Sequence, residues 1–154
     1  MYGVTHMDVC EEIALITFRK IPCHLPLISD IFARFATHDI VIDMISQTSP
    51  AGEFVSISFT CMESDMVKVL EISKELSQKY PQLKPMVSSG NCKIQLFGEE
   101  MRTASGVFAR ALSALAGTAV EVQQVSTSEV DISLLVTAVH LSEATQALRK
   151  SFAL

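Results

Sequence analysis

The stretch Ile31-Phe32-Ala33-Arg34-Phe35-Ala36 decides the fold, because its apolar spacing returns 80 residues later in Ala111-Leu112-Ser113-Ala114-Leu115-Ala116. At the same offset, Ile40-Val41-Ile42 aligns with Val120-Glu121-Val122. Similar matches continue on both sides of these segments, with small shifts that indicate insertions in loops. A repeat of this kind constrains a fold more firmly than the propensities of single segments. The chain is therefore expected to contain two copies of one structural unit.

Each copy shows the same order of expected elements. A β run, at about 14–20 or about 92–98, precedes a helix whose apolar residues have helical spacing. Two alternating strands and a second helix follow, with the strands expected at 40–44 and 54–59 in the first copy and at 120–122 and 130–136 in the second. The apolar positions of the first helices are Ile28, Ile31, Phe32 and Phe35 in one copy and Val107, Phe108, Ala111, Leu112 and Leu115 in the other.

The last strand of each copy comes from a different part of the chain. In the first copy, a closing strand is expected at 83–88, which completes a β-α-β-β-α-β order. The second copy reaches Leu154 directly after its second helix. The stretch 4–9 is surplus to the first copy and is expected to supply the missing edge strand. The sequence thus predicts an α+β fold of two ferredoxin-like units, with antiparallel sheets and helices on one face. The first unit is expected at 10–89 and the second at 3–9 plus 90–154.

The composition limits the classes of function. The 154 residues are 49% hydrophobic and 19% charged, which is typical of a compact globular protein rather than a disordered one. A formal net charge of -5 disfavours nucleic acid and anionic membrane surfaces as partners, because both require a basic face. No apolar run is long enough to span a bilayer and the first residues lack a signal-peptide pattern, so a cytoplasmic location is expected.

Neither metal nor nucleotide chemistry is expected. The four cysteines lie far apart and form no C-x-x-C pair, and the four histidines are scattered, so reduced thiols and no metal site are predicted. No glycine-rich phosphate loop precedes a helix, and no lysine or acidic cluster suited to nucleotide and magnesium is recognisable. The chain is therefore not expected to be a catalyst on its own or to carry a cofactor.

A family resemblance appears in Val125-Ser126-Thr127-Ser128-Glu129-Val130-Asp131-Ile132-Ser133, which resembles the signature of ACT domains in the regulatory tail of aspartate kinases. Further matches follow in order at Asp43-Met44-Ile45, Ser56-Ile57-Ser58-Phe59 and Met101-Arg102. The resemblance covers essentially the whole chain. It implies a feedback sensor of lysine or threonine, a homodimer formed through the ACT units, and an aspartate kinase catalytic domain as a possible partner.

The resemblance places the ligand at the loop between the first strand and first helix of each copy. A helix N-terminus offers free N–H groups and a favourable dipole to a carboxylate. In the family this loop reads Asp-x-Pro-Gly. The first copy reads Cys23-His24-Leu25-Pro26, with Ile28 in the helix that follows, and it lacks the carboxylate and gains a proline without an N–H. Pro26 is also explained as an ordinary first-turn proline. The second copy, Thr103-Ala104-Ser105-Gly106, keeps the glycine and offers Ser105 as a helix N-cap.

Polar residues after the first helix of each copy are expected to form the second wall of the site. Glu129 is the expected partner of a lysine side chain, and Gln47 suits an α-amino group. The same residues are also explained by ordinary hairpin chemistry. Arg102, beside Glu99 and Glu100, is interpreted as part of a solvated charge pair. The remaining candidate residues are Thr48, Met101, Glu121, Val122, Ser126, Thr127 and Ser128.

Two further classes of function remain open. Cys23 and Pro26 favour the hypothesis of an ACT module that kept its fold as a structural or interaction domain and no longer binds a ligand. An enzyme on a ferredoxin-like scaffold is the third class, because a fold does not determine a function. It ranks last, since no nucleophile, base and orienting group can be assembled from this sequence.

Overall fold

A computed structural model describes residues 2–154, which divide into two compact units. The first unit is Glu12–Ser89, and the second combines the segment up to Glu11 with Gly90–Leu154. The fold is α+β, with antiparallel strand pairs and, in the described part of the chain, four α-helices, as the sequence predicted. None of these helices has the length and apolar character needed to cross a bilayer.

The first unit is built around four neighbouring strands and two helices. Strand β1 (His6–Pro22) leads into α1 (Leu25–Thr37), then β2 (Ile45–Gln47), β3 (Phe54–Met62), the 3-10 turn η1 (Glu63–Asp65) and α2 (Met66–Lys79). Strand β3 pairs antiparallel with both β1 and β2. The order of the strands is β2-β3-β1-β4, where β4 (Pro85–Phe97) begins in this unit.

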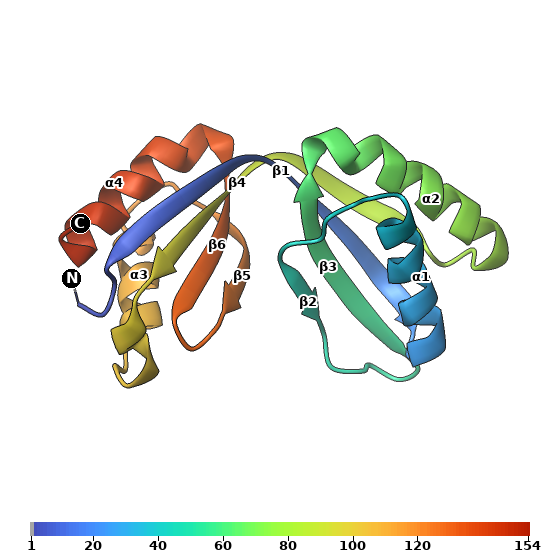
Figure 1. Ribbon diagram of the computed structural model, residues 1–154, viewed down its shortest axis with the longest axis horizontal. Helices are drawn as coiled ribbons and strands as arrows, with labels where there is room; N and C mark the ends of the chain where they lie inside the picture. Colours follow the sequence, from blue (N-terminus) through green and yellow to red (C-terminus); the bar gives the residue numbers. More distant parts are fainter. Residues whose placement is uncertain (1) are drawn as a thin grey trace. The chain divides into compact units, whose positions relative to one another are not determined.

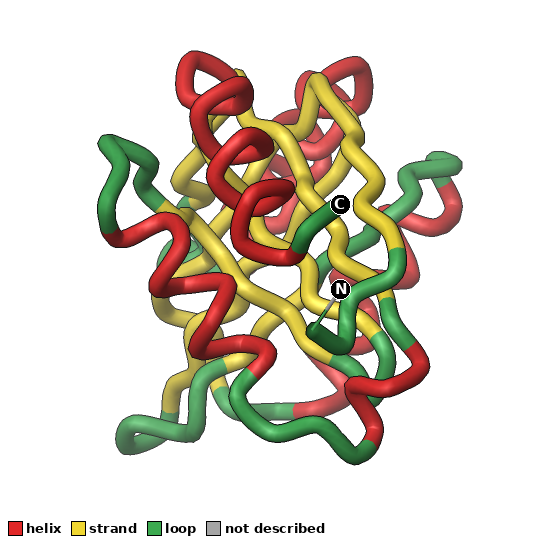
Figure 2. Tube along the Cα trace, turned by 90° about the vertical axis from the view of Figure 1, so that its left-hand side faces the viewer, coloured by secondary structure: helices red, strands yellow, loops and turns green. Residues whose placement is uncertain are grey.

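The second unit repeats this arrangement with the remainder of β4. The 3-10 turn η2 (Glu99–Arg102), α3 (Val107–Ala116), β5 (Val122–Thr127), β6 (Asp131–Thr137), η3 (Ala138–His140) and α4 (Leu141–Phe152) follow in sequence. Strand β6 pairs antiparallel with both β4 and β5, and the strand order is β1-β4-β6-β5. Figure 2 colours these strands and helices by type.

Each unit has its own apolar core between its helices and its strands. The predicted helix positions Ile31 and Phe35 are fully buried in the first core, where Phe35 and Phe59 pack with ring centroids 5.4 Å apart. In the second core, Ala111 of α3 and Leu148 of α4 are fully buried together with Leu134 of β6. The helical apolar spacing in the sequence is therefore the core-facing stripe of each helix.

Two long strands replace the four short ones that the sequence predicts at 4–9, 14–20, 83–88 and 92–98. Both β1 and β4 run without interruption from one unit into the other (Figure 1). Each contains one residue in the left-handed region where it passes between the units, Glu12 with φ 59° and Gly90 with φ 70°. A polar run around each of these residues hid the continuity of the strand in the sequence pattern.

The predicted strand at 40–44 is wrong, because β2 begins only at Ile45. Ile40 and Met44 are nevertheless buried, which explains the alternating pattern. The Met44 amide donates to the side-chain hydroxyl of Thr60 at 2.9 Å, so a side chain takes the place of a regular ladder partner. In the second unit the strand is likewise later than predicted, since β5 begins at Val122.

Candidate functional site

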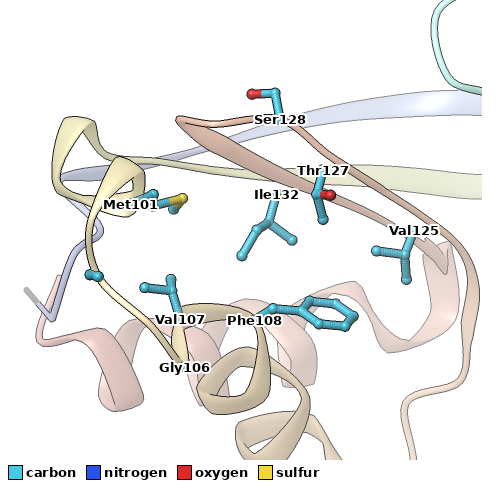
Figure 3. Close-up of a pocket in the computed structure, with 9 residues that line it drawn as sticks. Met101, Gly106, Val107, Phe108, Val125, Thr127, Ser128 and Ile132 are labelled. Atoms are coloured by element: carbon cyan, nitrogen blue, oxygen red, sulfur yellow. The ribbon is translucent and has the colours of Figure 1, made fainter.

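A pocket of about 470 Å³ lies in the second unit, between the η2–α3 connection and the β5–β6 hairpin (Figure 3). Segments that are about twenty residues apart in sequence form its two walls. Its lining residues are Met101, Ala104, Gly106, Val107, Phe108, Val125, Thr127, Ser128 and Ile132. Most of these side chains are apolar, and among them Thr127 and Ser128 carry the hydroxyl groups. This size is within the range of small-molecule pockets.

The start of α3 forms one wall of the pocket. Gly106 is the residue before the helix and has φ 83°, a left-handed conformation that glycine adopts without strain. The expected capping role of Ser105 is wrong, because Gly106 occupies the N-cap position and no side chain caps the helix. The first N–H groups of a helix have no partner within it. Val107 and Phe108, the first two residues of α3, both line the pocket, so their backbone N–H groups lie near it at the positive end of the helix dipole.

The β5–β6 hairpin forms the other wall. Val125 and Thr127 lie two residues apart on β5 and share the face that lines the pocket, while Ser126 lies on the opposite face. The Ser128 hydroxyl donates to the Asp131 carboxylate and accepts from the amide groups of Val130 and Asp131. The Thr127 hydroxyl has no hydrogen-bond partner among residues 2–154. It is the hydroxyl of the pocket that remains available to a ligand.

Asp131 stabilises the hairpin beside the pocket. Partial burial opposes ionisation of its carboxyl group, but hydrogen bonds from Ser128 and Gln95, together with the charge of Lys93, more than compensate. The pKa of Asp131 is therefore below its ordinary value. The carboxylate stays ionised at neutral pH and accepts the hydrogen bond of the Ser128 hydroxyl. This hydroxyl is therefore not free to donate to a ligand.

An ion-pair group lies at the edge of the pocket. Arg102 of η2 contacts the carboxylates of Glu99, at 3.2 Å, and of Glu129 at the tip of the β5–β6 hairpin. The prediction of a solvated pair between Arg102 and Glu99 is thus confirmed. Glu129, expected beside a lysine side chain, is paired with Arg102 and does not line the pocket.

The structure brings together only part of the predicted second-copy site. Four predicted residues line the pocket: Met101, Gly106, Thr127 and Ser128. Five others do not: Ser105, Glu121, Val122, Ser126 and Glu129. Val122 packs against the apolar core, and Glu121 is exposed. Ser105 lines a separate cavity on the other side of the same turn.

Sequence reasoning missed five lining residues: Ala104, Val107, Phe108, Val125 and Ile132. All five are apolar, and most of them were interpreted as core residues because they recur with the period of a helix or a strand. Phe108 retains 39% exposure, although its spacing is that of a core residue. Its position in the first turn of a helix, directly after the candidate loop, was the signal in the sequence that could have indicated a lining residue.

The predicted residues of the first unit have ordinary structural surroundings. Pro26 lies in the first turn of α1, as its alternative interpretation predicted. The Cys23 side chain is exposed, and its amide donates to the carbonyl oxygen of Glu53 at 2.7 Å. Ile28 packs against the core, Gln47 is exposed on β2, and the Thr48 hydroxyl accepts the amide of Ser56 at 2.9 Å.

Known proteins match this chain over most of its length. Residues 94–152 match the family model of the ACT domain. An aspartokinase of Bacillus sp. (strain MGA3) is 31% identical over 147 residues, which make up 94% of this chain. A crystal structure of aspartokinase alpha and beta subunits has a TM-score of 0.88 and 29% identity, and the match covers 98% of this chain and 99% of that one. The resemblance to ACT domains of aspartate kinases is thereby confirmed.

A third match shows the fold alone. The ligand-free regulatory subunit of aspartate kinase from Thermus thermophilus has a TM-score of 0.87 at 23% identity, covering 97% of this chain and 99% of that chain. The curated relatives are longer proteins: this chain spans about a third of the Bacillus aspartokinase, at 35% of its length.

Proposed function

We propose, from the premise that this chain is an ACT regulatory region of the aspartokinase type, that it binds a free amino acid in the pocket of the second unit. The observation that supports the proposal most directly is the meeting of a helix N-terminus, six apolar side chains and a free hydroxyl around one space of about 470 Å³. An amino acid needs donors for its carboxylate and a cavity for its side chain. This pocket offers both.

The carboxylate and the side chain of the ligand each have a matching part of the pocket. The carboxylate of the amino acid lies at the first turn of α3, where the N–H groups near Val107 and Phe108 and the helix dipole favour an anion. The side chain contacts Ile132 and Val125, and the hydroxyl of Thr127 supplies a directional hydrogen bond. A proposal of this kind requires no metal and no cofactor.

Threonine is a better match than lysine to the lining. Both amino acids carry an α-ammonium group, but lysine adds a second ammonium group on its side chain. The nine lining residues include no carboxylate that could face this second group, and Glu129 is already paired with Arg102. The methyl and hydroxyl groups of threonine match a lining of apolar side chains with one free hydroxyl. Lysine remains the second candidate, because an aspartokinase III of E. coli, 19% identical and with a TM-score of 0.74, was crystallised with lysine and aspartate.

The wider organisation follows the same proposal. The two compact units are two ferredoxin-like ACT units, the first at 10–89 and the second at 3–9 plus 90–154. The strand orders β2-β3-β1-β4 and β5-β6-β4-β1 support this proposal, because each puts the four strands of a unit in the same succession. The chain acts in the cytoplasm as a homodimer joined through its ACT units. It controls the catalytic domain of an aspartate kinase and is not itself the catalyst.

A second candidate function applies to the first unit. Its loop carries Cys23 and Pro26 where the family has a carboxylate and a glycine, and Pro26 lies inside the helix. These two residues favour a structural role without a ligand for this unit. One unit then senses the amino acid and the other serves assembly.

Isothermal titration calorimetry with threonine and lysine at millimolar concentration tests the proposal. Thr127→Val removes the free hydroxyl at nearly constant volume and is expected to weaken threonine binding roughly three- to tenfold. Ser126→Ala, one residue earlier and outside the lining, is the matched control and leaves the affinity unchanged. The absence of heat with both amino acids contradicts amino-acid sensing. Binding that is lost in a Cys23 or Pro26 variant, and kept in Thr127→Val, would place the ligand in the first unit.

A further inference from the structure

The N-terminal segment Tyr2-Gly3-Val4, called here the strap, packs directly behind the pocket of the second unit. Val4 is fully buried in the core of that unit. The next residue, Thr5, donates its amide to the carbonyl oxygen of Phe97 at 2.7 Å and so joins β4. The strap is therefore an integral part of this unit.

One turn of the chain separates the pocket from the strap. Ala104, Gly106 and Val107 line the pocket on one side and, on the other, a second cavity of about 380 Å³. Tyr2 and Gly3 also line that second cavity. A ligand that displaces this turn in either direction must change the space available to the strap.

The contact between Gly3 and the turn is tight. A side-chain carbon on Gly3 would lie 3.0 Å from Cγ2 of Val107 and 3.8 Å from Cβ of Ala104. Gly3 also has φ 90°, which a residue with a side chain rarely adopts. The backbone of the strap therefore lies close to two residues that line the pocket, and a side chain on Gly3 would crowd Val107.

The strap also continues to the end of α4. The guanidinium carbon of Arg110 lies 3.6 Å from the ring centroid of Tyr2. The same guanidinium donates two hydrogen bonds to the carbonyl oxygen of Ser151, from Nε at 2.9 Å and from Nη2 at 2.7 Å. A cation at the C-terminal carbonyl groups of a helix is favourable, so the Arg110 guanidinium is held in place where it contacts the Tyr2 ring.

We infer that the strap is coupled to the pocket, so that its packing changes when the pocket is occupied. The inference rests on the proposed function, because it needs an amino acid in the pocket. Binding shifts Val107 and Ala104, and the packing of Gly3 and Tyr2 changes with them. Coupling between two sites acts in both directions, so a substitution that shifts the strap is expected to change the amino-acid affinity of the pocket.

Tyrosine fluorescence gives a direct readout of the strap. The chain has two tyrosines and no tryptophan, so Tyr80→Phe leaves Tyr2 as the single strong emitter. Titration of this variant with threonine or lysine is expected to change the Tyr2 emission with the same midpoint as the calorimetric heat. Tyr2→Phe, which retains Tyr80 in the first unit, is the matched control and is expected to show no change.

A glycine substitution tests the reciprocal effect. Gly3→Ala inserts a methyl group against Val107 and is expected to weaken amino-acid binding about fivefold or more, although residue 3 does not line the pocket. Gly52→Ala is the matched control. It has a similar left-handed φ of 65° but nothing within 4 Å of the added carbon, so it carries the same kind of backbone strain without the contact. Its amino-acid affinity is expected to equal that of the parent.

The outcomes separate this inference from the proposed function. No heat with either amino acid overturns both. Heat with a constant Tyr2 emission, or with an unchanged affinity in a folded Gly3→Ala variant, overturns the strap inference and leaves the proposed function standing. If Gly3→Ala does not fold, the Tyr2 titration alone decides.

Discussion

Gln95 of β4 donates a hydrogen bond from Nε2 to the carboxylate of Asp131 on β6, at 2.8 Å. The two residues lie diagonally across the β4–β6 pair, since Gln95 is opposite Ser133 and Asp131 is opposite Phe97. Together with Ser128, Gln95 lowers the pKa of Asp131 despite its partial burial. The hairpin that lines the pocket is therefore stabilised by an ionised carboxylate.

Acid is expected to weaken this hairpin. Because the folded-state pKa of Asp131 is lowered, its contribution to stability is fully present above the unfolded-state pKa of about 4. The contribution declines as the pH falls through the lower folded-state value. Asp131→Asn is expected to flatten the dependence of the free energy of unfolding on pH in this acidic range, measured by urea denaturation. Ser128→Ala, which removes one donor, should reproduce part of the change, and an unaltered pH dependence in both variants contradicts the assignment.

A methyl group at Gly98 is expected to be severely destabilising. It would lie 1.7 Å from the carbonyl oxygen of Gly3 and 3.1 Å from Cα of Val4, and backbone atoms cannot move aside as a flexible side chain can. Gly98→Ala should lower the free energy of unfolding by at least about 2–3 kcal/mol. Gly117→Ala is the control of opposite sign: with no atom within 4 Å and a negative φ, it should be neutral or stabilising by up to about 1 kcal/mol. Equal melting temperatures for the two variants would refute the close approach.

The buried side chain of Gln124 on β5 is expected to lower the free energy of unfolding. It is 9% exposed, and its amide nitrogen and oxygen have no hydrogen-bond partner among residues 2–154. Gln124→Leu keeps a similar volume and removes the unsatisfied amide, so it should raise the free energy of unfolding by about 1–3 kcal/mol. Gln123→Leu, at the exposed neighbouring position, should change it by less than about 0.5 kcal/mol. A destabilised Gln124→Leu protein would mean that the amide makes a needed interaction.

Release of Glu129 is expected to favour lysine. In Arg102→Gln the hairpin carboxylate loses its cationic partner and becomes available to an ammonium group at the pocket edge. Lysine affinity should rise by up to about fivefold, since exposed ion pairs contribute about 1 kcal/mol or less, while threonine affinity stays constant. The double variant Arg102→Gln with Glu129→Gln should lose the gain. Calorimetry at low and high salt measures both, and an equal gain for threonine would speak against a role of Glu129.

Elements with a regular apolar period were predicted well from the sequence. The spacing of Ile31 and Phe35, and of Ala111 and Leu115, predicted α1 and α3, because a buried stripe must recur with the period of the helix. The strand at 40–44 failed, since burial of Ile40 and Met44 produces the same alternation without a ladder. The continuity of β1 and β4 was also missed, because the polar residues around Glu12 and Gly90 interrupt the apolar pattern.

In the candidate site, too, the residues with a local sequence signature were predicted and the contacts between distant residues were not. Gly106 and the hairpin residues Thr127 and Ser128 could be found from the sequence, because a helix start and a turn have local signatures. Glu129 was assigned to a ligand although Arg102, 27 positions away, binds it. Local patterns report what a residue can do, and they do not report which distant partner already occupies it.

The order of apolar and polar residues alone set the helices, the α+β class and the twofold repeat, since these follow from short-range periodicity. Only the folded chain decided that Val107 faces a pocket on one side and Gly3 on the other, and that the Thr127 hydroxyl stays free while that of Ser128 is used. The contact between Val107 and Gly3 joins segments that are far apart in the sequence. The energies of such contacts depend on distances of a few ångströms, which packing of the whole unit determines.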